Sequence, residues 1–137
     1  KNVFLPHNHS LNSVVYTGTH DNNTTIGWWL SEADDGVRSF MREYIGHDPH
    51  EINWEMVRIA MQSPAHTAIF PMQDILNLGA EARMNTPGKQ GGNWTWRFTS
   101  AGFDHPGKDR LAHLTWLSMR RPDQREREYG DQAVRKD

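Results

Sequence analysis

Two short apolar runs, 14–17 (VVYT) and 67–70 (TAIF), constrain the fold of this chain most strongly. β-Branched and aromatic residues of this kind are typical of buried strands, and a glycine or a proline closes each run. Between them, residues 35–45 and 53–62 carry apolar side chains at the spacing of amphipathic helices. The order strand, helices, strand predicts a βαβ unit whose two strands pair in parallel.

Polar side chains follow both predicted strands. His20, Asp21 and Asn22 come shortly after the first strand, and Gln73 and Asp74 come shortly after the second. A right-handed crossover places both clusters at the same edge of the sheet. Because ligands of parallel α/β folds bind outside the carboxyl ends of the strands, we expect a functional site at this edge.

The histidines also raise other possibilities. His7-Asn8-His9 has the letters of a nuclease motif, but that motif is spread over a ββα unit, so we expect a polar loop. His20-Asp21 follows a strand and a glycine, whereas metal-dependent phosphohydrolases carry such a pair on helices with further histidine ligands. We therefore expect no metal site. A structural role for Asp21, which could cap the next helix, stays open at this point.

Composition narrows the class of protein. The chain has 137 residues, one domain at most, with a mean hydropathy of −0.82 and six tryptophans. A net charge of −2 gives no reason to expect nucleic acid or an anionic membrane as a partner. No apolar run approaches a membrane span, and the absence of cysteine is typical of a reducing compartment. We expect a cytoplasmic protein, and the first residue, Lys1, indicates a processed chain or a piece of a longer one.

The remaining segments predict a loop, a helix and a tail. Residues 80–98 lack periodicity but contain Trp94 and Trp96, so they could recognise a sugar by stacking, or simply pack as a surface loop. Residues 108–120 carry leucines at helical spacing. From residue 122 to 137 charge dominates, and we expect a solvated, flexible tail there.

Five motifs in one order identify a family resemblance. The chain resembles the C-terminal part of the 4-α-glucanotransferases, also called amylomaltases or disproportionating enzymes, through residues 5–8 (LPHN), 16–22 (YTGTHDN), 71–74 (PMQD), 81–88 (EARMNTPG) and 92–97 (GNWTWR). The family fold is a (β/α)₈ barrel. The resemblance implies that residues 1–121 form about its last two β/α units, within an α/β fold, and that the remainder of the barrel is their partner.

The resemblance also implies a chemistry. The family transfers a segment of a 1,4-α-glucan to the 4-hydroxyl of an acceptor by a retaining double displacement. Asp21 matches the carboxylate that stabilises the transition state, and His20 and Asn85 match residues that contact sugar. The side chains expected to support them without touching the sugar are Asn22, Gln73, Asp74 and Arg83. The nucleophile and the acid/base lie outside this sequence.

Two consequences follow from the resemblance. The ligands are maltooligosaccharides and other α-1,4-glucans, with no cofactor, and the isolated chain is expected to be inactive. Asn23 stands where many relatives carry aspartate. The alternative is a carbohydrate-binding fragment without catalysis, which the tryptophan-rich loop and the asparagines would serve equally well.

Overall fold

The two predicted strands form a parallel pair. In the computed structural model, which describes residues 2–122, β1 (Val14–Tyr16) pairs with β2 (Thr67–Ile69), and Val15 lies opposite Ala68. The other elements are α1 (Thr25–Ser31), α2 (Asp35–Ile45), α3 (Ile52–Met61), α4 (Met72–Ile75) and α5 (Gly107–Leu117), with 3₁₀ turns η1 (Pro6–Asn8), η2 (Ala80–Ala82) and η3 (Ser100–Asp104). The βαβ prediction is confirmed.

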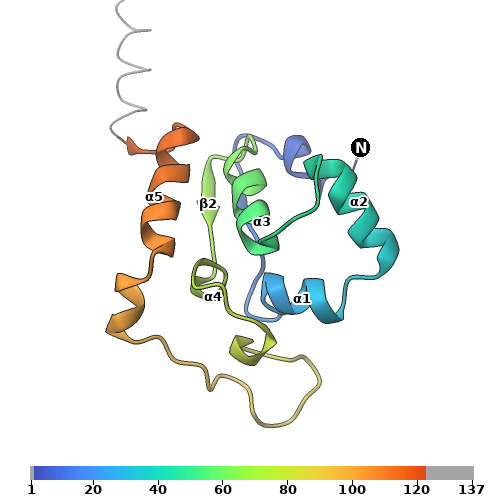
Figure 1. Cartoon of the computed structure of the whole chain (residues 1–137), viewed down its shortest axis with the longest axis vertical. Helices are drawn as coiled ribbons and strands as arrows, with labels where there is room; N and C mark the ends of the chain where they lie inside the picture. The colour runs from blue at the N-terminus through green and yellow to red at the C-terminus, as the bar shows by residue number, and fades with distance from the viewer. Residues whose placement is uncertain (1, 123–137) are drawn as a thin grey trace, which may run out of the picture.

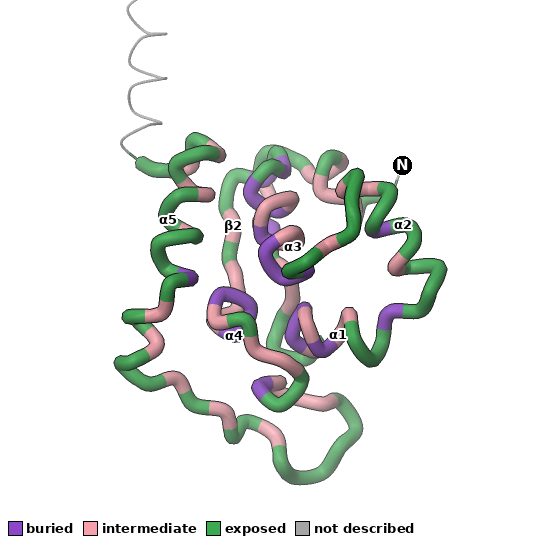
Figure 2. Tube along the Cα trace, viewed as in Figure 1, coloured by how far each residue is buried: buried purple, intermediate pink, exposed green. Residues whose placement is uncertain are grey.

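The core is built on α3. Its residues Trp54, Val57 and Met61 pack with Ile75 of α4 in one buried cluster, against which Leu111 and Leu114 of α5 also pack. A second cluster joins Val15 of β1 to Ala60 on the same helix. Figure 1 shows β2 between α3 and α5, and Figure 2 shows the buried residues concentrated on α3 and α4. The helix thus fixes both strands and the segment that follows β2.

Local signals set the helix ends. Asp34 accepts a hydrogen bond of 2.8 Å from the backbone N–H of Val37 and begins α2, and Gly46 ends it with φ +85°. The helix α4 ends in a C-cap at Leu76, and Asn77 then takes the left-handed conformation with φ +60°. Asparagine tolerates this conformation better than other residues with a side chain.

The strands are less buried than their composition predicts. Val15 is buried, but Tyr16 is 54% exposed and Ile69 58% exposed. In the described part of the chain each strand has one hydrogen-bonded neighbour, so an edge and much of the apolar surface stay uncovered. Phe40 on the apolar face of α2 is likewise exposed. The chain therefore presents apolar surface on its sheet and on α2.

Two further expectations concern a membrane-spanning helix and the charged tail. Among residues 2–122 no helix is long and apolar enough to cross a membrane. The charged tail expected from residue 122 falls, apart from Pro122, outside the described residues.

Gly27 allows α1 to approach η2 closely. A β-carbon at this position would overlap Oδ1 of Asn23 and lie 3.0 Å from Cα of Ala80. By contrast, a β-carbon on Gly36 of α2 would meet only Oδ1 of Asp34, at 3.3 Å. The close approach brings the segment after β2 against the segment after β1.

We therefore expect Gly27→Ala to lower the free energy of unfolding by about 1–3 kcal/mol, the usual effect of overpacking. Gly36→Ala is the matched control, since alanine is the better helix former and its β-carbon would meet only one atom of an exposed side chain. Urea midpoints of the two variants measure the difference. A Gly27→Ala midpoint equal to that of the control would contradict the close approach.

Candidate active site

The predicted polar clusters do meet at one edge of the sheet. The residues after Tyr16 form a loop, 18–24, which we call the His20–Asp21 loop, and it lies beside the start of α4. The long segment between η2 and η3 passes the same end of the strands (Figure 1). Three segments far apart in the sequence therefore converge at the carboxyl ends of β1 and β2.

Asp21 lies at the centre of this convergence. Its side chain is 50% exposed, and its Oδ1 accepts a hydrogen bond of 2.6 Å from Nδ2 of Asn85, which lies 64 residues further along the chain. Nε2 of His20 lies 3.5 Å from the same oxygen. The three residues expected to form the site are therefore brought together. They form a half-exposed carboxylate that is held by an amide and flanked by an imidazole.

Arg83 joins the two loops that carry these side chains. Its Nη2 donates to the carbonyl oxygen of Asp21 at 2.8 Å and its Nε donates to the carbonyl oxygen of Asn85 at 2.9 Å. The backbone N–H of Asn85 donates to the carbonyl oxygen of His20 at 3.0 Å. The guanidinium group offers donors in a fixed planar fork, so Arg83 sets the distance between the loops without contacting the Asp21 carboxylate.

Glu32 completes the attachment of Arg83. Its Oε1 accepts from Nη1 of Arg83 at 3.1 Å and from Nδ2 of Asn23 at 2.8 Å. Glu32 follows α1, and no motif or spacing in the sequence points to it. Asn22 turns back on its own loop, where its Oδ1 accepts from the backbone N–H of Thr19 at 2.8 Å. Asn22 therefore supports the loop, and Glu32 is a partner that sequence reasoning missed.

The structure places Gln73 and Asp74 deeper than expected. Both residues were expected at the exposed edge of the sheet. Instead they lie in α4, which begins at Met72, and both side chains are buried. Gln73 donates from Nε2 to the carbonyl oxygen of Ala82 at 3.2 Å. Asp74 bonds to residues on either side of the His20–Asp21 loop and does not contact Asp21 itself.

Trp94 lies against His20. Their ring centroids are 5.2 Å apart with an interplanar angle of 37°, and half of the Trp94 side chain stays exposed. The backbone N–H of Trp94 donates to the carbonyl oxygen of Met84 at 2.7 Å, and its φ of +61° turns the chain there. Trp96 pairs with Phe98 at 6.4 Å instead. Of the two tryptophans in this loop, Trp94 is the one whose ring lies against a site residue, in a tilted arrangement.

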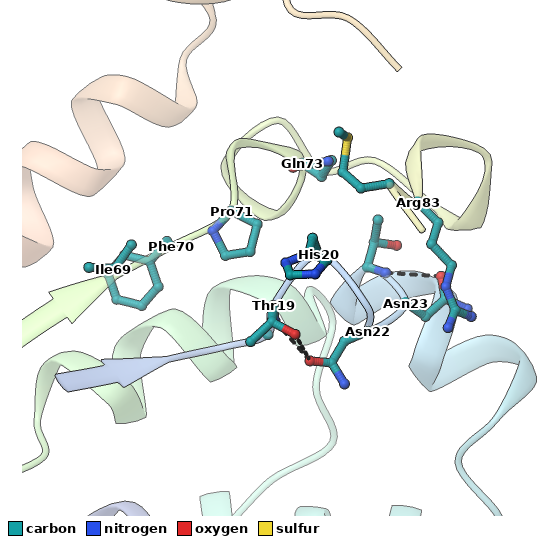
Figure 3. A pocket seen from close by; sticks show the side chains of 12 residues that line it. Thr19, His20, Asn22, Asn23, Ile69, Phe70, Pro71, Gln73 and Arg83 are labelled. Carbon is teal, nitrogen blue, oxygen red and sulfur yellow. Dashed lines mark hydrogen bonds between the residues drawn. The ribbon is translucent and has the colours of Figure 1, made fainter. Parts of the chain in front are cut away.

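A pocket of about 270 Å³ opens beside this arrangement. Figure 3 shows His20 between the loop side chains and the start of α4. The pocket combines apolar walls with hydroxyl, amide and guanidinium groups, and its labelled lining residues are Thr19, His20, Asn22, Asn23, Ile69, Phe70, Pro71, Gln73 and Arg83. Such a mixture is typical of sites for small polar ligands. Asp21 and Asn85 lie beside this lining rather than within it.

The described residues hold no group of three or more histidine, cysteine or carboxylate side chains placed to bind a metal ion. The site can therefore offer hydrogen bonds, one half-exposed carboxylate and an aromatic face. These are the groups that recognise sugar hydroxyls and sugar rings.

Comparison with known proteins identifies the family. A family model described as 4-alpha-glucanotransferase matches residues 1–102. The chain is 49% identical over 122 residues to 4-alpha-glucanotransferase DPE1, chloroplastic/amyloplastic, of Arabidopsis thaliana, covering 85% of this chain and 21% of that protein. It is 45% identical over 105 residues to the 4-alpha-glucanotransferase of Thermus thermophilus, covering 71% and 21%.

A solved structure gives the same result for the fold. An amylomaltase from Streptococcus agalactiae in complex with acarbose matches with a TM-score of 0.79 and 32% identity, over 87% of this chain and 24% of that one. The expected α/β fold, part of an amylomaltase barrel, is confirmed. The chain spans about a fifth to a quarter of the length of the relatives it matches. This chain belongs to the 4-alpha-glucanotransferase family.

Proposed function

We propose that this chain forms one wall of the active site of a 4-alpha-glucanotransferase. The observation that carries the proposal is the placement of Asp21, a half-exposed carboxylate at the strand ends held by Asn85 and flanked by His20. Among residues 2–122, Oδ1 of Asp21 is the oxygen that is bonded, and Oδ2 accepts no hydrogen bond. One oxygen thus fixes the carboxylate while the other is open to a sugar hydroxyl.

The proposed role of Asp21 is to stabilise the transition state. Transfer with retention passes through an oxocarbenium-like transition state, in which hydrogen bonds to the 2-hydroxyl strengthen and lower the barrier by several kcal/mol. A carboxylate can accept from two adjacent hydroxyls of one glucose ring. Asp21 would do so from one face of the sugar, and His20 would add a second contact beside it.

The proposed substrates are α-1,4-glucans. The relatives are named 4-alpha-glucanotransferases and the structural relative holds acarbose, which supports maltooligosaccharides as donors and acceptors. The exposed face of Trp94 beside His20 suits stacking on a glucose ring.

The proposed partner is the rest of the barrel. A double displacement needs a nucleophile and an acid/base, and the family resemblance places both outside these residues. The uncovered apolar side chains of β1 and β2 support a protein in which further strands pack beside them.

We expect Asp21→Ala, made in the intact protein that contains this chain, to lower kcat by two or more orders of magnitude, because a lost transition-state contact of this kind is worth several kcal/mol. Binding of maltotriose should persist. The assay is disproportionation of maltotriose into glucose and longer chains.

Asp35→Ala is the matched control, since Asp35 is exposed in the first turn of α2. Near-normal turnover by Asp21→Ala would overturn the catalytic assignment of Asp21.

Asn85→Ala tests the sugar-contacting amide. We expect a several-fold rise in the KM for maltotriose together with a smaller fall in kcat, because the variant loses a sugar contact and frees Asp21 Oδ1. Asn12→Ala, an exposed asparagine just before β1 at the opposite end of the strand, is the control. If both variants gave the same kinetics, Asn85 would have no place in the site.

A further inference from the structure

The carboxylate of Asp74 is buried, and both of its oxygens accept hydrogen bonds. Asp74 is 2% exposed. Its Oδ2 accepts from Oγ1 of Thr17 at 2.6 Å and from Oγ1 of Thr25 at 2.8 Å, and its Oδ1 accepts from the backbone N–H of Thr25 at 2.9 Å. A buried carboxylate is tolerated when donors of this kind satisfy it. All three donors belong to Thr17, directly after β1, and Thr25, the first residue of α1, which lie 57 and 49 residues earlier in the chain.

The positions of the donors matter more than their number. Thr17 immediately precedes the His20–Asp21 loop and Thr25 immediately follows it. Both ends of this loop are therefore tied to one carboxylate. Closing a loop at its base reduces the conformations its middle residues can sample.

The carboxylate itself is held on the rigid part of the chain. Nδ2 of Asn53, which is completely buried in α3, donates to the carbonyl oxygen of Asp74 at 2.7 Å. The neighbouring Ile75 belongs to the main core cluster with Val57. The two ends of the loop are thus connected to the hydrophobic core through α4. The middle of the loop is instead held by hydrogen bonds from the segment 83–85.

We propose that Asp74 is a positioning residue for Asp21, fixing the base of the His20–Asp21 loop so that the Asp21 carboxylate is set before substrate binds. This inference rests on the proposed function of Asp21. A displacement of about 1 Å in a catalytic group can lower the rate about a hundredfold. Asp74 therefore acts on the rate through the loop while contacting neither sugar nor Asp21.

The test removes one hydrogen bond to Asp74 at a time in the intact protein. Thr17→Val keeps the shape of a β-branched residue but loses the hydroxyl that bonds to Asp74, whereas Thr17→Ser keeps the hydroxyl. We expect Thr17→Val to lower kcat for maltotriose disproportionation about tenfold with KM changed less than about twofold, and Thr17→Ser to restore most of the rate. Asp74→Ala, which cuts all three ties, should lose more if it folds.

Thr115→Val is the matched control. Thr115 is half-buried in α5 and its hydroxyl donates to a backbone carbonyl, but it lies outside the loop and outside α4. Rates are measured well below the melting temperature of each variant. A lower melting temperature with unchanged kcat in Thr17→Val would overturn the proposal, because it would give Asp74 a purely structural role.

Amide hydrogen exchange separates this proposal from the proposed function. In Thr17→Val we expect faster exchange in residues 18–24 and unchanged exchange in α2, with Thr115→Val giving neither effect. Equal acceleration in both segments, or none, would overturn the positioning role. If the unaltered protein has no transferase activity, the proposed function fails, while the exchange experiment still decides whether Asp74 holds the loop.

Discussion

The carboxylate of Asp74 joins three parts of the chain that the sequence keeps far apart. It accepts hydrogen bonds from Thr17, directly after β1, and from Thr25 at the start of α1, and its backbone carbonyl accepts one from Asn53 in the core helix α3. These bonds add buried connections to the short ladder that pairs the two three-residue strands. The geometry of the site at the strand ends depends on this buried group.

A second layer of contacts sets the exposed part of the site. Arg83 binds the carbonyl oxygens of Asp21 and Asn85, and Asn85 in turn binds the Asp21 carboxylate. The buried layer fixes where the loop starts and ends, and the exposed layer fixes the side chain that we propose faces the ligand. Such a division is typical of sites whose substrate-contacting groups must be set before binding.

Much of this fold could be predicted from local signals. The run Val14–Thr17, the cap at Asp34 and the stop at Gly46 act over a few residues, and the parallel pairing follows from the order of the elements. The meeting of Asp21 with Asn85 required the family resemblance, because nothing in the spacing brings them together. Burial of Asp74 and its bonds to Thr17 and Thr25 depend on how α4 packs under the loop. The prediction that Tyr16 and Ile69 are buried is wrong for residues 2–122. Apolar strand residues predict packing against neighbouring elements, and the described residues do not provide those neighbours.

The proposed function requires that Asp21, His20 and Asn85 together face a glucan. A crystal structure of the intact protein that contains this chain, soaked with acarbose, tests it most directly, since a relative with 32% identity binds this molecule. We expect an Asp21 carboxylate oxygen within hydrogen-bond distance of ring hydroxyls, with His20 and Asn85 contacting the same sugar. Acarbose bound with no contact to any of the three residues would contradict it.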